Sequence, residues 1–172
     1  MDNSIVVTND VRFAYLNVVT PRQNKLSGKE EYSCTLLISK EDKETLDKVN
    51  GAIDFAKNQK WPGKQLTFKN QCLKDGDGLD SEGRPYPEEY HHCFALNVKA
   101  KVDFKPKVVN ENREPIEFPE EFKSGDYGRA VIRAYAYDAP GNKGVAFGLN
   151  AIQKRTDGDP LNGGPDYTTY FD

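Results

Sequence analysis

The chain has 172 residues, of which 30% are charged and 37% hydrophobic, and its formal net charge is −3. This length fits one domain, which can bury a core without metal or disulfide staples. The charge balance excludes a uniformly basic nucleic-acid binder but leaves room for a local basic face. Aromatic residues reach 11% and include nine Tyr and nine Phe. The composition therefore predicts a modest core with many ring-bearing positions.

The N-terminal ten residues lack the basic and apolar pattern of a secretory signal, and no run approaches the roughly 18 apolar residues of a membrane span. Cys34, Cys72 and Cys93 show no C-x-x-C spacing, which favours reduced, partly buried thiols. We therefore expect a cytoplasmic protein that makes no membrane contact.

The first half of the chain predicts two strands and one helix. Residues 11–19 and 32–38 are rich in β-branched and aromatic types, as strands are. Ser39, with Asp42 three residues on, predicts a helix start of the capping-box type. Residues 61–63, WPG, then end the helix. Its apolar residues recur at helical spacing: Leu46, Val49, Ile53 and Ala56.

The second half predicts strands separated by long insertions. Residues 64–69 alternate weakly, and residues 74–92 are too rich in Gly, Pro and acid to be core. Residues 93–104 read as a strong strand, 110–128 as a second long insertion, and 129–137 and 144–153 as strands joined by a tight turn. The pattern predicts a mostly β protein, a small antiparallel barrel or sandwich with one main helix and long loops.

Along residues 94–107, which include most of the predicted 93–104 strand, parity gives one apolar face and one cationic face that Asp103 interrupts, because side chains alternate across a strand. The apolar set is Phe94, Leu96, Val98, Ala100, Val102 and Phe104, and the cationic set is Lys99, Lys101, Lys105 and Lys107. Taken alone, this strand favours a solvated face as the explanation of such lysines.

The strand at 129–137 strengthens the case for nucleic acid. Arg129, Arg133, Tyr135 and Tyr137 share one face, and cations with rings suit a single strand's phosphates and bases. The alternative is that both tyrosines cover a second core layer. In the first strand, Tyr15 shares a side with Phe13, and the sequence leaves open which side faces solvent.

From Thr156 onward, Gly, Pro, Asp and Asn dominate, so we predict a domain over 1–155 and a disordered acidic tail over 156–172. The tail carries a charge of −4, whereas the remaining 155 residues hold 24 basic and 23 acidic groups. The tail would either compete with nucleic acid for the basic face, dock on a partner or serve only solubility. Its candidate docking residues are Asp166, Tyr170, Phe171 and Asp172.

Four segments carry a family resemblance: RFAYLNVVTP, YSCTLLISKEDKETLDKVNGAI, FKSGDYGRAVIRAYAYD and NKGVAFGLNAIQKRTDGDPLNGG. Together they resemble phage single-stranded DNA-binding proteins formerly grouped as a family of unknown function, which are similar to the replication protein of short-tailed coliphages. The resemblance spans Val6 to Gly164 and implies an OB-type barrel. It also implies sequence-independent binding of single-stranded DNA in phage replication, recombination and repair, in the host cytoplasm.

We expect no cofactor or metal, and the resemblance supports the 129–137 strand as part of the DNA-facing sheet. Individual DNA contacts follow from strand parity alone, which selects Tyr15, Lys99, Lys101, Lys105, Lys107, Arg129, Arg133, Tyr135 and Tyr137. Replication or recombination proteins are the expected partners of the tail. A homodimer is compatible with the coliphage resemblance, although no residue pattern specifies one. Two features depart from the family. The helix directly follows the second predicted strand, which is earlier than in the usual OB order. The related replication proteins tend to end a strongly acidic tail on Phe, whereas here Phe171 is penultimate.

Other sites are weaker. The acidic run at 75–86 lacks the ligand spacing of a calcium loop, and His91, His92 and Cys93 lack the spaced pairs of a zinc site. The sequence contains no G-x-S-x-G, Walker or G-x-G-x-x-G motif, so no enzyme is expected. Two alternatives remain open: a non-enzymatic phage protein-interaction module and, more weakly, a metal-dependent nuclease.

Overall fold

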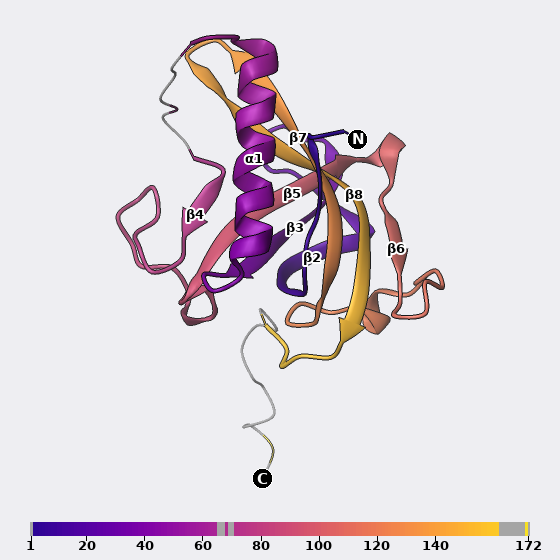
Figure 1. The fold of residues 1–172 in the computed structure, drawn as a ribbon. Coiled ribbons are helices and arrows are strands. Elements are labelled where there is room, and N and C mark those ends of the chain that lie inside the picture. Colours follow the sequence, from indigo (N-terminus) through magenta and orange to yellow (C-terminus); the bar gives the residue numbers. More distant parts are fainter. Residues whose placement is uncertain (1, 65–67, 69–70, 162–170, 172) are drawn as a thin grey trace.

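Five strands close into a barrel in the computed structural model, which describes residues 2–64, 68, 71–161 and 171 (Figure 1). They are β2 (Val11–Gln23), β3 (Glu30–Ser39), β5 (Cys93–Lys101), β7 (Tyr127–Ala139) and β8 (Asn142–Thr156). The pairing runs β7–β2–β3–β5–β8, and β7 also pairs with β8, which closes the ring. Only the β5–β8 pairing within the ring is parallel. The predicted mostly β barrel of OB type is confirmed.

Three-residue strands that were not predicted from the sequence pair with strands of this ring. They are β1 (Ile5–Val7) beside β7, β4 (Leu73–Asp75) beside β5, and β6 (Lys107–Val109) beside β8. In the described residues they are accompanied by three one-turn 3-10 helices: η1 (Glu88–Tyr90), η2 (Val102–Phe104) and η3 (Pro119–Glu121). Elements of three residues are too short for hydrophobic periodicity to reveal.

The predicted helix is α1 (Lys43–Lys60), which follows β3 in the chain. It lies alongside the barrel (Figure 1). Its N-cap is Asp42, which accepts a hydrogen bond from the Thr45 N–H at 3.2 Å, whereas Ser39 is the last residue of β3. The predicted Ser39 cap was therefore wrong by three residues. No helix in the described part of the chain is long and apolar enough to cross a membrane.

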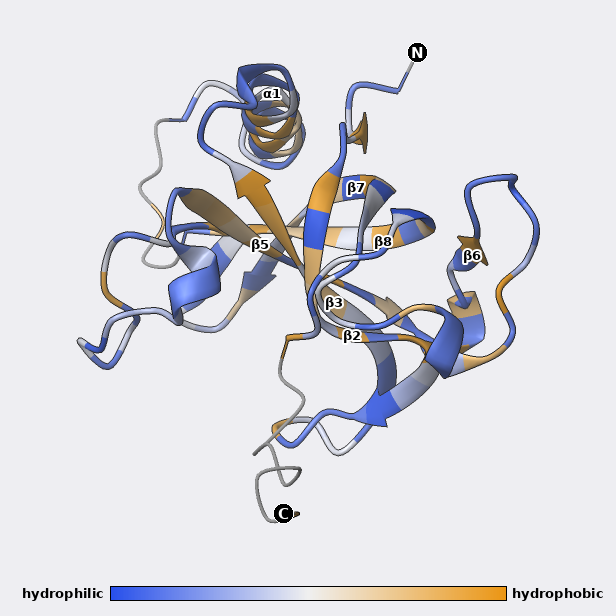
Figure 2. Cartoon of the chain, turned by 90° about the horizontal axis from the view of Figure 1, so that it is seen from below, coloured by the Kyte–Doolittle hydropathy of each residue, from blue (hydrophilic) through white to orange (hydrophobic). Residues whose placement is uncertain are grey.

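The core lies inside the barrel and under α1, which packs against β7, β1 and β8. Figure 2 shows α1 end-on beside strands along which hydrophobic and hydrophilic residues alternate. The predicted parity holds in β5 and β7, where Leu96, Val98, Ala130 and Ile132 are buried. Phe13 and Phe147 complete the centre, and each large side chain buried in this way stabilises the fold by about 1.5–3 kcal/mol.

The predicted strand over 93–104 is wrong in its last three residues. β5 ends at Lys101, and the chain turns through η2, where Val102 is 42% and Phe104 73% exposed. Strand parity does not continue through a 3-10 turn, so these two residues are not core. Lys105 and Lys107 consequently do not extend the cationic face of β5, and Lys107 lies on β6.

The segment after β8 is held against the barrel. The carboxylate of Asp157 lies 2.7 Å from Lys154 Nζ, and the Gly158 N–H donates to Asp126 Oδ1 at 3.1 Å. The Leu161 N–H donates to the Ser124 carbonyl at 2.9 Å. Thus residues 157–161, placed in the tail by the sequence analysis, contact the domain. The tail residues Asp166, Tyr170 and Asp172 lie outside the described residues, and Phe171 is 80% exposed.

These contacts give a test of the domain boundary. A chain ending at Thr156 should lose roughly 1–3 kcal/mol of unfolding free energy, because the buried Asp126 carboxylate loses the Gly158 donor. A chain ending at Leu161 keeps every contact just described and should unfold at the same temperature as the full chain. Thermal denaturation followed by circular dichroism compares the three. Equal midpoints for both truncations would place the boundary at residue 156 after all.

Candidate nucleic-acid interface

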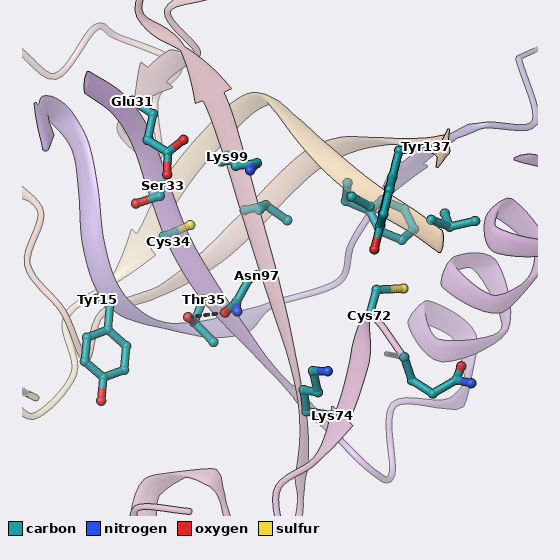
Figure 3. A pocket seen from close by; sticks show the side chains of 15 residues that line it. Tyr15, Glu31, Ser33, Cys34, Thr35, Cys72, Lys74, Asn97, Lys99 and Tyr137 are labelled. Carbon is teal, nitrogen blue, oxygen red and sulfur yellow. Dashed lines mark hydrogen bonds between the residues drawn. The ribbon is translucent and has the colours of Figure 1, made fainter. Parts of the chain in front are cut away.

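A groove of about 430 Å³ runs over the outer face of β3 and β5 (Figure 3). Alternation along the two strands puts Ser33, Thr35, Asn97 and Lys99 on one face, and the inward-facing side chains of Cys34 and Val98 also line part of the groove. Across the floor, Thr35 Oγ1 donates to Asn97 Oδ1 at 2.7 Å, which fixes the orientation of the amide. The floor is formed by Ser33, Thr35, Asn97 and Lys99.

Tyr15 flanks one side of this groove because β2 contains a bulge. The β2–β3 register shifts between Ala14 and Asn17, and Tyr15 has a φ of 49°. Phe13 is therefore fully buried while Tyr15 is 43% exposed, so the prediction that they share a side was wrong. A tyrosine in the left-handed region costs about 1–3 kcal/mol and persists where neighbours hold it, often at functional sites. Here the Leu16 N–H donates to Ser124 Oγ at 2.9 Å.

Behind Tyr15 lies a stacked pair of tyrosines from the long polar loop. The rings of Tyr86 and Tyr90 are 5.4 Å apart and nearly parallel, at 6°. Burial, with a smaller contribution from the neighbouring Tyr15, raises the pKa of Tyr90 to about 12. Tyr90 packs with Ala14, Leu37 and Ala95 in a second apolar cluster. The loop judged too polar for core thus supports the position of Tyr15.

Tyr137 flanks the opposite side of the groove, from the part of β7 that pairs only with β8 (Figure 3). Its register partner is Gly144, and a Cβ at that position would lie 2.5 Å from the Tyr137 hydroxyl oxygen. The glycine therefore leaves the space that this ring occupies. Tyr135 is 41% exposed, and burial together with nearby Tyr137 and Glu31 raises its pKa. Tyr135 lines a different hollow, together with Arg133 and the α1 residue Phe55.

The predicted cations divide between the groove and other surfaces. Lys99 lines the groove, and Lys101 shares its face of β5, opposite Glu31. Arg129 Nε donates to the Thr8 carbonyl at 2.9 Å, and Arg133 Nη2 lies 2.9 Å from Asp2 Oδ2, so both contact the N-terminal segment. The structure therefore brings together Tyr15, Lys99 and Tyr137, with Lys101 adjacent, and places Tyr135, Arg129, Arg133, Lys105 and Lys107 elsewhere.

Several groove residues escaped the sequence analysis. Ser33 and Asn97 were accessible to it, because strand parity puts them opposite the core residues Cys34 and Leu96. Lys74 and Cys72 were not, since Lys74 lies on β4 and Cys72 directly precedes it, in a region that showed no strand pattern. Lys74 adds a second cation to the lining of the groove, and Glu31 contributes an acidic side chain to the same lining.

The thiols of two cysteines are held in buried surroundings, and two aspartates of the acidic loop form ion pairs with a lysine. All three thiols are free, and burial raises the pKa of Cys34 and Cys72, so both remain protonated near neutral pH. Asp75 and Asp77 both bind Lys40 Nζ, at 2.6 and 2.7 Å. Among the residues that the structure describes, no group of three or more His, Cys, Asp or Glu could hold a metal.

Comparison with solved structures finds the same fold in phage proteins. The single-stranded DNA-binding protein of bacteriophage Enc34, in complex with single-stranded DNA, superposes with a TM-score of 0.78 at 23% identity, over 94% of this chain and 91% of that one. The single-stranded DNA-binding protein gp2.5 of bacteriophage T7 gives a TM-score of 0.62 at 11% identity, over 96% and 99% of the two chains. At these identities the likeness shows the fold.

Sequence comparison gives the family. Protein p50 of Acyrthosiphon pisum secondary endosymbiont phage 1 is 28% identical over 166 residues, which are 91% of this chain and 85% of p50. The family model described as "Enterobacter phage Enc34, ssDNA-binding protein" matches residues 4–172, nearly the whole chain. The chain therefore belongs to the family of the Enterobacter phage Enc34 single-stranded DNA-binding protein.

Proposed function

We propose that the chain binds single-stranded DNA without sequence preference and protects it during phage replication, recombination and repair in the host cytoplasm. The observation that carries this proposal is the pair of partly exposed tyrosines, Tyr15 and Tyr137, on opposite sides of a floor that holds Lys99. Membership of the Enc34 family and the solved Enc34 complex with single-stranded DNA support the same ligand.

The groove suits an unpaired strand better than a duplex. A base can stack on a tyrosine only when its face is open, and every base has such a face, so recognition tolerates any sequence. Lys99 and Lys74 attract phosphates, while the polar side chains of Ser33 and Asn97 offer hydrogen bonds to sugar or base edges. Because the binding releases counterions from the strand, the affinity should fall as salt rises.

Fluorescence anisotropy of labelled oligo-dT and of a matched duplex, at two salt concentrations and with EDTA, tests the proposal. Salt-sensitive binding of the single strand alone is expected. Equal binding of the duplex would contradict the stacking mechanism, and absence of binding to both would leave the groove as a protein-interaction surface. Poly-dT would displace a protein partner from the groove only if DNA occupies the same site.

We further propose that the protein acts without catalysis. Incubation of a labelled single strand with the protein and Mg²⁺, followed by a denaturing gel, should leave the strand at full length. Shortened products that disappear with EDTA would instead favour the metal-dependent nuclease.

We also propose that the C-terminal tail is a docking segment for replication or recombination proteins, and that the protein forms a homodimer. Light scattering of the full chain and of a chain ending at Leu161 tests the dimer and the tail's part in it.

Gly144→Ala should weaken binding although residue 144 contributes no side chain to the groove. The added methyl would meet the Tyr137 ring, whose hydroxyl oxygen and Cζ would lie at 2.5 and 2.7 Å, so the ring must move. Gly148→Ala on the same strand is the matched control, because its methyl meets only backbone oxygens at 3.8 and 3.9 Å. Anisotropy should show a loss for the first variant alone. Equal affinities would mean that the position of the Tyr137 ring does not matter.

A further inference from the structure

The segment that follows β5 forms an exposed basic and aromatic knob, defined here as residues 101–107. In η2 (Val102–Phe104), Val102 is 42% and Phe104 73% exposed, although both are residues that usually lie inside a protein. The segment holds three lysines and one acid, Asp103. Contiguous exposed apolar groups rimmed by polar residues mark interaction sites in many proteins.

The knob lies at one end of the groove. Lys101 follows Lys99 on the same face of β5, two residues or roughly 7 Å farther along the strand. In Figure 3, Lys99 and Glu31 lie toward the end of β5 where the knob begins. On the far side of η2, Lys105 Nζ lies 6.0 Å from the ring of Tyr32, which is buried and points to the opposite face of β3 from the groove residues Glu31 and Ser33. A strand leaving the groove past Lys99 therefore meets Lys101, the first residue of the knob.

We infer that the knob is a second subsite for single-stranded DNA, in which a base stacks on Phe104 and phosphates lie near Lys101, Lys105 and Lys107. This inference rests on the proposed function of the groove. Phe104 is 73% exposed, so its ring is accessible to a base, and the three lysines of the knob supply the charge that a DNA strand requires. The subsite accounts for lysines that strand parity had placed in the groove and that the structure places beyond it.

Charge separates this site from the other exposed phenylalanine of the barrel loops. Phe118 is 56% exposed, but Glu117, Glu120 and Glu121 surround it in the chain. A polyanion would be repelled there and attracted at the knob. Phe118→Ala is therefore a matched control for Phe104→Ala: the same ring is removed from a similarly exposed position with the opposite charge around it.

The length dependence of binding tests the second subsite. Affinities of the full-length chain for oligo-dT of about 4 to about 16 nucleotides are measured by anisotropy for wild type, Phe104→Ala, Phe104→Tyr and Phe118→Ala. Phe104→Ala should match wild type on oligonucleotides short enough to fill the groove alone, and it should fall at least about fivefold behind on longer ones. Phe104→Tyr and Phe118→Ala should follow wild type at every length, and unfolding temperatures should not differ.

The other outcomes separate this inference from the function on which it rests. If wild type binds and Phe104→Ala equals it at all lengths, the knob is not a subsite, while the groove proposal stands. An equal loss at every length would place Phe104 in the groove's own binding and likewise overturn a second subsite. If wild type binds no length, the proposed function itself fails.

Discussion

Replacing Tyr137 by alanine is expected to weaken binding of oligo-dT by about fivefold to a hundredfold, because one base loses its stacking partner. The ring lies in the groove opposite Tyr15 and has no other ring packed on it among the aromatic contacts of the described residues. Its loss removes a base platform and leaves the core intact. Tyr137→Phe should keep most of the affinity, because stacking needs the ring and not the hydroxyl.

Salt titration distinguishes this effect from an electrostatic one. Tyr137→Ala removes no charge, so the slope of log affinity against log salt should stay as in wild type. Lys99→Gln should flatten that slope by about 0.7, the value for one phosphate contact on a single strand. Tyr127→Ala is the matched control on the same strand, since Tyr127 is 37% exposed but stacks on Arg12 outside the groove. A loss at Tyr127 as large as that at Tyr137 would contradict the groove as the binding site.

The parts of this interface that the sequence predicted are those governed by local alternation. Within β5, Leu96 and Val98 turn inward and Lys99 outward because side chains alternate, whatever the rest of the chain does. The same rule placed Tyr135 and Tyr137 on the outer face of β7. The mostly β fold class was predictable for the same reason, because each long strand shows the alternation of apolar and polar residues within its own sequence.

What the sequence did not predict depends on residues far away in the chain. The exposure of Tyr15 results from a bulge that Ser124, 108 residues later, helps to hold. Arg133 is drawn to Asp2, 131 residues earlier, by the pairing of β7 with the three-residue strand β1. No window along the sequence contains both partners, so parity alone could not tell a cation in the groove from one in an ion pair.

Asp126 is where we expect the largest effect on stability. Its side chain is 0% exposed, and the carboxylate accepts hydrogen bonds from the N–H groups of Lys123 and Gly158 at 3.0 and 3.1 Å. Lys123 Nζ and Lys154 Nζ approach it to 3.2 and 3.3 Å. Asp126→Asn keeps the shape but removes the charge, so the free energy of unfolding should fall by about 2–4 kcal/mol. For a chain of this size the melting temperature should fall by roughly 5–15 °C.

The stability that Asp126 contributes should depend on pH, and the direction of this dependence follows from the shift of its pKa. Burial alone would raise the pKa of Asp126, but hydrogen bonds from Lys123 and Gly158 and the charge of Lys154 outweigh it and hold the pKa below its usual value. The unfolded chain therefore takes up this proton at a higher pH than the folded one. The stabilisation should be complete above about pH 4 and should fade as the pH drops through the folded-state pKa.

Urea denaturation of wild type and Asp126→Asn between pH 7 and pH 3 measures both effects. The difference in unfolding free energy should be constant near neutrality and should narrow below about pH 4. Asp157→Asn is the control, because Asp157 binds the same two lysines but its side chain is 76% exposed, and such surface pairs contribute little. If the two variants lose equal stability, burial of Asp126 does not decide its contribution, and the end of the barrel is held by surface charge alone.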